Sequence, residues 1–162
     1  MSASRIVQEL STQVELEYLS SQRYLLLSKG CLNRNMDHLS NFFQTRAQEG
    51  VTRMAHLFHY MKNIGAIPCP DEAEQPHLSE FCLDELFEQA LQGLRLRLMH
   101  LSQLKRTAQE MGDFSTMAFL QQLFTQYRHE RDCMLEMQQQ RAGINLPSPS
   151  GRARGSSVYE TA

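Results

Sequence analysis

Residues 42–68, FFQTRAQEGVTRMAHLFHYMKNIGAIP, carry the pattern that predicts the fold of the chain. Positions three and four residues apart form a stripe that is apolar at both ends and carries two arginines in its middle: Phe43, Arg46, Gly50, Arg53, Leu57, Tyr60 and Ile64. This spacing is that of one face of an α-helix. Gly65 is a helix stop signal, and Pro68 cannot continue a helix. We therefore predict a long helix over residues 37–64 with one buried face.

Three further segments show the same period and also end near glycines. They predict helices over residues 4–29, over residues 83–111 and, after a cap at Asp113 or Ser115, up to about residue 141. At 1.5 Å rise per residue, each helix is roughly 40 Å long. The predicted fold class is an all-α four-helix bundle.

The lengths of the connections predict the topology of this bundle. The short turns after the first and third helices make each flanking pair antiparallel. The middle connection, residues 65–82, contains three prolines and is long enough to cross the bundle, with Ile67 and Leu78 as apolar anchors. We expect residues 1–143 to form the bundle and residues 144–162, rich in Pro, Ser and Gly, to form a flexible tail.

Composition narrows the classes of partner and compartment. The 162 residues contain 16 Lys and Arg and 18 Asp and Glu, for a net charge of -2, which gives no basic surface for nucleic acid or membrane. We find no apolar run near the roughly 20 residues of a transmembrane helix and no signal-peptide region, which predicts a cytoplasmic protein. Four separated cysteines lack a CxxC pair, so we expect core or surface thiols rather than a zinc or redox motif: Cys31, Cys69, Cys82 and Cys133.

Charged residues interrupt three of the four predicted core stripes. They are Glu17, Arg53 (with Arg46) and Glu130, whereas the third helix is assigned an apolar stripe through Leu83, Phe87, Ala90, Leu94, Leu98 and Leu101. A buried carboxylate without a partner costs several kcal/mol, so these groups need a metal or an opposite charge. Di-iron sites in bundles use Glu and Glu-x-x-His, but the four predicted helices contain no Glu-x-x-His and offer only Gln126-x-x-His129. The residues predict a polar core without a full set of di-iron ligands.

Four segments resemble the helices of bacterial non-haem ferritin: LSTQVELEYLSSQRYLLLS at 10–28, residues 42–68, LDELFEQAL at 83–91 and FLQQLFTQYRHE at 119–130. The resemblance extends over residues 4–143. It implies a hollow 24-subunit shell that stores iron, either as a homo-oligomer or as a hetero-oligomer with an active ferritin subunit.

The resemblance also assigns positions in the family's iron sites. The first-helix iron ligand falls on Glu17 and a nearby core tyrosine on Tyr24. The remaining positions of the ferroxidase centre are occupied by residues that the family does not use there: Gly50, Arg53, Leu94 and Tyr127. An accessory iron site on the inner surface falls on Glu49, Gln126, His129 and Glu130. The haem-binding methionine of related ferritins falls on Val51, so haem is not expected.

Two interpretations stay open for each group of candidate residues. Glu17 is either an iron ligand or the partner of Arg53 in a buried salt bridge, with Glu130 able to join the same group. Glu49, His129 and Glu130, with Gln126, form either a residual metal site or a solvated polar patch.

The expected function is therefore an iron-storage subunit with a degenerate ferroxidase centre and weak or no oxidation of ferrous iron. The alternative is a structural or regulatory shell subunit that forms mixed cages with an active ferritin and does not store iron alone. A ferritin-type enzyme that uses two other metals has too few ligands in this sequence.

Overall fold

The computed structural model describes residues 2–67 and 82–145 of the chain, and within them it contains helices and no strand. The four helices are α1 (Ser2–Leu32), α2 (Asp37–Asn63), α3 (Leu83–Glu110) and α4 (Phe114–Asn145). The predicted all-α four-helix class is confirmed. No helix in this part of the chain combines the length and apolar character that crossing a bilayer requires.

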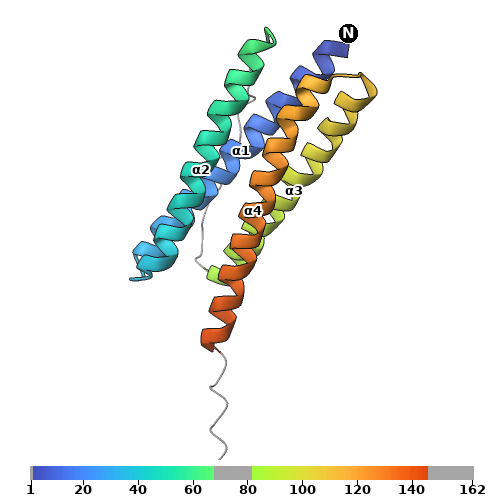
Figure 1. Cartoon of the computed structure of the whole chain (residues 1–162). Helices are drawn as coiled ribbons and strands as arrows, with labels where there is room; N and C mark the ends of the chain where they lie inside the picture. The colour runs from blue at the N-terminus through green and yellow to red at the C-terminus, as the bar shows by residue number, and fades with distance from the viewer. Residues whose placement is uncertain (1, 68–81, 146–162) are drawn as a thin grey trace, which may run out of the picture.

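The helices form two antiparallel pairs, α1 with α2 and α3 with α4 (Figure 1). The end of α2 and the start of α3 lie at opposite ends of the bundle, so α2 and α3 run parallel. Ile67 is 86% exposed and is therefore not the buried anchor that the sequence predicted. The other predicted anchor, Leu78, and the tail beyond residue 145 lie outside the described residues.

Two helices end at the predicted glycines. Gly65 and Gly112 adopt φ values of +75° and +65°, which a residue without Cβ reaches at little cost. The next residue then donates back into the last turn, from Ala66 N to Met61 O at 2.8 Å and from Asp113 N to Ala108 O at 2.9 Å. This is the Schellman arrangement, which satisfies carbonyls at the helix end.

The first helix does not stop at Gly30 as predicted. Helix α1 continues to Leu32, and Asn35 takes the left-handed conformation with φ of +58°. Met36 N then donates to Cys31 O at 2.9 Å, which closes the same type of cap. Asparagine tolerates this conformation, and the buried Cys31 holds the extra turn against the core.

The start of α4 is fixed by Asp113, one of the two caps predicted. Its carboxylate accepts from Thr116 N at 3.0 Å and from Thr116 Oγ1 at 2.5 Å. Thr116 Oγ1 also lies 2.6 Å from Tyr60 Oη, so the cap ties the start of α4 to α2.

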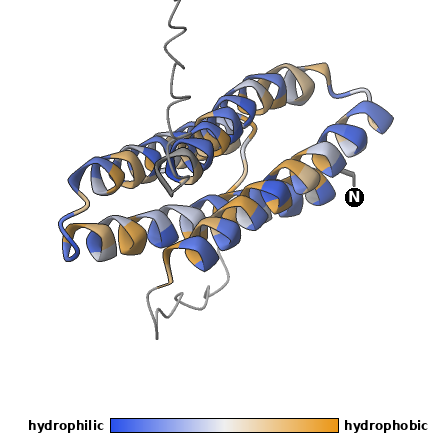
Figure 2. Cartoon of the chain, turned by 90° about the horizontal axis from the view of Figure 1, so that it is seen from below, coloured by the Kyte–Doolittle hydropathy of each residue, from blue (hydrophilic) through white to orange (hydrophobic). Residues whose placement is uncertain are grey.

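The interior contains two apolar clusters. One is centred on leucines near the α3–α4 turn, among them Leu10, Leu57 and Leu104, and the other on Phe43 and Phe87 toward the opposite end. Figure 2 shows apolar and polar residues interspersed along all four helices, as expected when each helix buries one face. Charged side chains are buried at the middle of the same helices, and they form the candidate site.

Two positions of the core stripe predicted for α3, Leu83 and Leu98, are only partly buried. Arg97 is only 1% exposed, whereas Leu98, which was assigned to the core, is partly exposed. The observed stripe follows a spacing of three and four residues through Leu94, Arg97, Leu101 and Leu104. An arginine thus occupies a core position in α3.

Candidate functional site

Each helix contributes one charged side chain to the middle of the bundle. Glu17 of α1, Arg53 of α2, Arg97 of α3 and Glu130 of α4 are 0%, 4%, 1% and 0% exposed. We call these four residues the charge cluster. Two carboxylates and two guanidinium groups make it neutral as a whole, which is the condition under which buried charges are tolerated.

The two arginines bridge the two carboxylates. Arg53 donates from Nε to Glu17 Oε1 at 3.0 Å and from Nη2 to Glu130 Oε2 at 2.7 Å. Arg97 binds Glu130 in a forked arrangement, from Nη2 to Oε1 at 2.7 Å and from Nη1 to Oε2 at 3.2 Å. Arg97 Nη1 also lies 3.4 Å from Glu17 Oε1. Such paired, charge-assisted hydrogen bonds fix both position and orientation.

Mutual attraction keeps Glu130, Arg97 and Arg53 ionised despite their burial. Burial alone would raise the pKa of the Glu130 carboxyl, but Arg97 and Arg53 hold it below its ordinary value. Burial would lower the pKa of Arg97, but Glu130 and Glu17 raise it well above the ordinary value. The pKa of Arg53 is raised in the same way by the two carboxylates. Glu130, Arg97 and Arg53 therefore keep their charges at neutral pH.

Two tyrosines enclose the charge cluster. Tyr24 Oη donates to Glu130 Oε1 at 2.5 Å, and the face of Tyr127 lies 5.3 Å from Arg53 Cζ and 5.1 Å from Arg97 Cζ. The aromatic face of Tyr127 is thus stacked against both cations. Burial is the main reason that the pKa values of both phenols are raised, so neither tyrosine ionises at neutral pH.

A chain of hydrogen bonds extends from Tyr127 toward the surface. Gln13 Nε2 donates to Tyr127 Oη at 2.7 Å, and Gln13 Oε1 lies 2.7 Å from His100 Nδ1. Because the amide oxygen only accepts, His100 Nδ1 is assigned as the donor. Burial lowers the pKa of His100, which favours the neutral imidazole with its proton on Nδ1.

Helices α1 and α2 approach closely at Gly50. A Cβ atom built on Gly50 would lie 2.1 Å from Ser21 Oγ and 3.4 Å from Glu17 Oε2. Neither of these two oxygens has a hydrogen-bond partner in the described residues. Any larger side chain at position 50 therefore requires Ser21 to change its rotamer.

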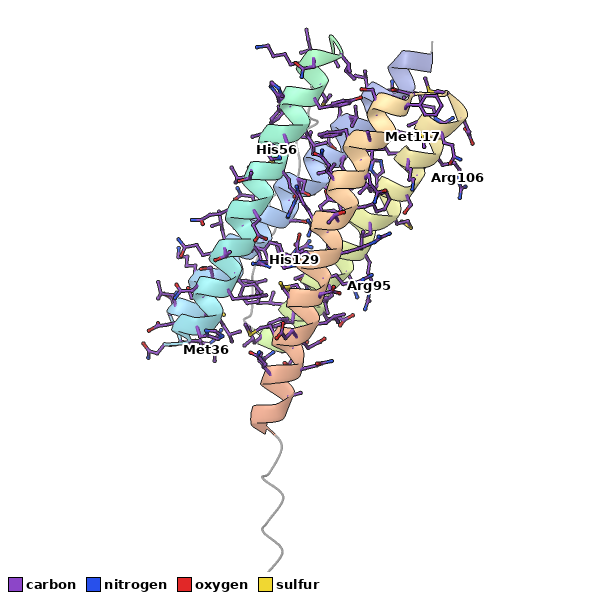
Figure 3. All side chains as sticks on the ribbon, viewed as in Figure 1. Met36, His56, Arg95, Arg106, Met117 and His129 are labelled. Atoms are coloured by element: carbon purple, nitrogen blue, oxygen red, sulfur yellow. The ribbon has the colours of Figure 1, made fainter. Side chains whose placement is uncertain are left out.

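The candidate residues of the predicted accessory site are only partly brought together. A groove of about 500 Å³ between α2 and α4 is lined by Glu49, Gln126 and His129, with Thr45, Gln48, Thr52, Arg53 and Thr125. Figure 3 shows His129 on the α2 side of α4. Glu130, by contrast, lies in the charge cluster, and Glu49 pairs with Arg46 at 3.1 Å. Across residues 2–67 and 82–145, no three His, Cys, Asp or Glu side chains are grouped to hold a metal ion.

Sequence reasoning missed Arg97, the most deeply buried cation of the site. One signal could have found it: spacing of three and four residues from Leu94 leads to Arg97. Arg46, which the sequence grouped with Arg53, instead pairs with Glu49 and stacks on Phe42 at 5.2 Å.

Comparison with known proteins gives consistent matches. Residues 7–141 match the model of the ferritin-like domain. The chain is 31% identical over 130 residues to a bacterial non-heme ferritin-like protein of Escherichia coli, covering 80% of this chain and 78% of that protein. It is 29% identical over 127 residues to a bacterial non-heme ferritin of Shigella flexneri, covering 78% and 76%.

Solved structures give the same result for the fold. A ferritin of Chlorobium tepidum superposes with a TM-score of 0.82 at 27% identity, over 88% of this chain and 87% of that one. An apo-ferritin from Pseudo-nitzschia multiseries gives a TM-score of 0.80 at 17% identity, over 86% and 89%. At that lower identity the likeness concerns the fold alone.

Proposed function

This chain belongs to the ferritin family, and from that premise we propose that it is a shell subunit in which a salt-bridge cluster replaces the centre that oxidises ferrous iron. The family membership confirms the resemblance predicted for residues 4–143. The bundle has the iron-storage fold, and iron is its cargo. The proposal concerns what this subunit does with that cargo.

One observation carries the proposal: Arg53 and Arg97 both lie between Glu17 and Glu130. Three of the four carboxylate oxygens already accept hydrogen bonds from guanidinium groups. Two ferrous ions here would be placed beside two cations that do not deprotonate in proteins. Among the described residues the buried carboxylates are Glu17 and Glu130, so none is left to balance that charge, and these residues do not fit a di-iron centre.

The neighbouring positions support the same proposal. Gly50 has no side chain to bind a metal, and its close contact with Ser21 limits the space beside Glu17. Leu94 is an apolar core residue, and Tyr127 presents its ring to the two arginines. We propose that the subunit oxidises ferrous iron weakly or not at all, and that it contributes to a hollow shell that holds ferric mineral.

A second candidate function is a subunit that depends on an active ferritin in mixed shells. The groove between α2 and α4 favours it, because its lining has a single carboxylate, Glu49, among hydroxyl, amide and imidazole side chains and the cation Arg53. That carboxylate is paired with Arg46. Ferric ions prefer several oxygen ligands with negative charge, so this surface would nucleate mineral poorly when the shell contains no other subunit.

The test is to mix purified protein with ferrous salt in air and to follow ferric absorbance. Oxidation by the protein alone should not exceed the rate in buffer, and co-assembly with an active ferritin should restore mineral formation. Rapid oxidation by the protein alone would contradict the proposal. Mineral loading without an active partner would contradict the candidate function that depends on mixed shells and would be consistent with a storage subunit.

A further inference from the structure

One pair of potential metal ligands lies outside the charge cluster. Cys133 Sγ lies 3.6 Å from His129 Nε2, one turn apart on α4. Cys133 is partly exposed, and His129 lines the groove between α2 and α4. The two side chains therefore share one accessible helix face, as residues four apart do.

The separation of the two atoms is that of two ligands on one tetrahedral ion. An ion bound at about 2.05 Å from nitrogen and about 2.3 Å from sulfur holds those atoms about 3.6 Å apart. A metal binds to the lone pair of His129 Nε2, and the same lone pair would accept a hydrogen bond from the Cys133 thiol. The contact thus has the spacing that chelation requires, and the tautomer with its proton on Nδ1 leaves the Nε2 lone pair facing the sulfur.

From this geometry we infer that His129 and Cys133 form a two-ligand site for a thiophilic d¹⁰ cation, with zinc as the representative ion. Thiolate and imidazole select such ions, whereas iron stored as ferric oxide prefers carboxylate and water. Glu49 is held by Arg46, so solvent completes the coordination sphere. Binding displaces the thiol proton to solvent, so each ion bound releases one proton from Cys133 when the thiol is protonated.

The helical spacing of the two ligands keeps the conformational cost of binding an ion small. Paired ligands four residues apart on one helix are a recurrent zinc-binding arrangement because the backbone holds both on one face. The α4 helix is anchored at its middle by Glu130, immediately next to His129, through the bonds to Arg53 and Arg97. Ion binding therefore requires no rearrangement of the backbone. This inference does not depend on the proposed function, since the site shares no ligand with the charge cluster.

The test uses the full-length protein, kept reduced with a phosphine. Zinc affinity is measured by competition with a chromophoric chelator, and cobalt(II) is substituted to observe the thiolate-to-cobalt charge-transfer band. Variants Cys133→Ser and His129→Gln are compared with Cys82→Ser, which removes an exposed thiol at the start of α3. Circular dichroism verifies that each variant keeps its helical content.

We expect the parent protein and Cys82→Ser to show the cobalt band, and Cys133→Ser to lose it. Loss of an outer-shell partner alone weakens metal sites about 10–100-fold, so removing either direct ligand should weaken this zinc site at least about tenfold. A band that persists in Cys133→Ser, or zinc affinity unchanged by His129→Gln, would overturn the inference. In that case the contact is only a thiol–imidazole hydrogen bond.

Discussion

Arg97 Nη2 lies 2.7 Å from Glu130 Oε1, so a guanidinium of α3 is joined to a carboxylate of α4 inside the bundle core. Arg53 of α2 binds the same carboxylate at 2.7 Å and also binds Glu17 of α1 at 3.0 Å. The four helices are therefore connected by one neutral group of charges. In this account, the cluster replaces a metal centre as the means of satisfying buried carboxylates.

The first prediction concerns Arg97. Replacing it by methionine leaves Glu17 and Glu130 with a single cation, so the variant Arg97→Met should lose about 3–5 kcal/mol of unfolding free energy. The matched control is Arg95→Met, since Arg95 is largely exposed and lies 3.6 Å from Glu88. That surface pair should contribute about 0–1 kcal/mol. Urea unfolding of both variants gives the comparison, and equal losses would show that the cluster is not a buried network.

The second prediction concerns acid stability. The pKa of Glu130 lies below its ordinary value of 4.5 in the folded state, so the unfolded chain takes up this proton more readily. The stabilisation is therefore present above the ordinary pKa and is lost as the pH falls through the folded one. Between about pH 5 and pH 3, the unfolding free energy of the parent protein should fall more steeply than that of Glu130→Gln. Parallel pH profiles of the two proteins would contradict the assignment.

The third prediction concerns the close approach at Gly50. In a helix interior, alanine is more stable than glycine by about 0.5–1 kcal/mol. In the Gly50→Ala variant the added Cβ meets Ser21 Oγ, so this gain should be reduced or reversed. In a Ser21→Ala background the oxygen is gone and the full gain should appear. A double-mutant cycle of unfolding free energies measures the coupling between positions 21 and 50, and a coupling of zero would contradict this geometry.

The fourth prediction concerns restoration of a metal centre. The triple change Gly50→Glu, Arg53→His and Leu94→Glu adds metal-binding side chains at three substituted positions, but it leaves Arg97 among the carboxylates. We expect the triple variant to stay slow and the same variant with Arg97→Met to oxidise ferrous iron faster. In the fourfold variant, four carboxylates balance two ferrous ions, and no guanidinium competes for them.

Initial rates of ferric absorbance in air compare the two variants with the parent. If Arg53→His alone produced a fast oxidase, the proposal that the salt-bridge cluster as a whole prevents iron oxidation would be wrong. If the triple variant matched the fourfold one, Arg97 would have no part in excluding iron.

The fold was predictable to a large extent because its signals are local. The stripes of α1 and α4 that contain Glu17 and Glu130 are buried as their spacing indicates. The stops at Gly65 and Gly112 depend on the backbone of one residue. The end of α1 was less predictable, because the helix continues past Gly30 to Leu32, where the buried Cys31 packs the extra turn against the core.

The site was predictable only in part because it depends on contacts between helices. The charge at position 17 could be seen in the sequence, but the choice between Leu98 and Arg97 as core residue depends on the exact facing of α3. A long side chain can reach the core from a flanking position, so hydropathy assigned the wrong neighbour. The pair His129 and Cys133 has no motif of the CxxC kind, and its geometry became apparent only from the rotamers on α4.

The most direct test of the salt-bridge account is anomalous diffraction at the iron absorption edge from crystals soaked with ferrous salt. We predict no iron peak between Glu17 and Glu130, with both guanidinium groups in place. Two iron peaks in that space, with Arg53 and Arg97 displaced, would contradict it.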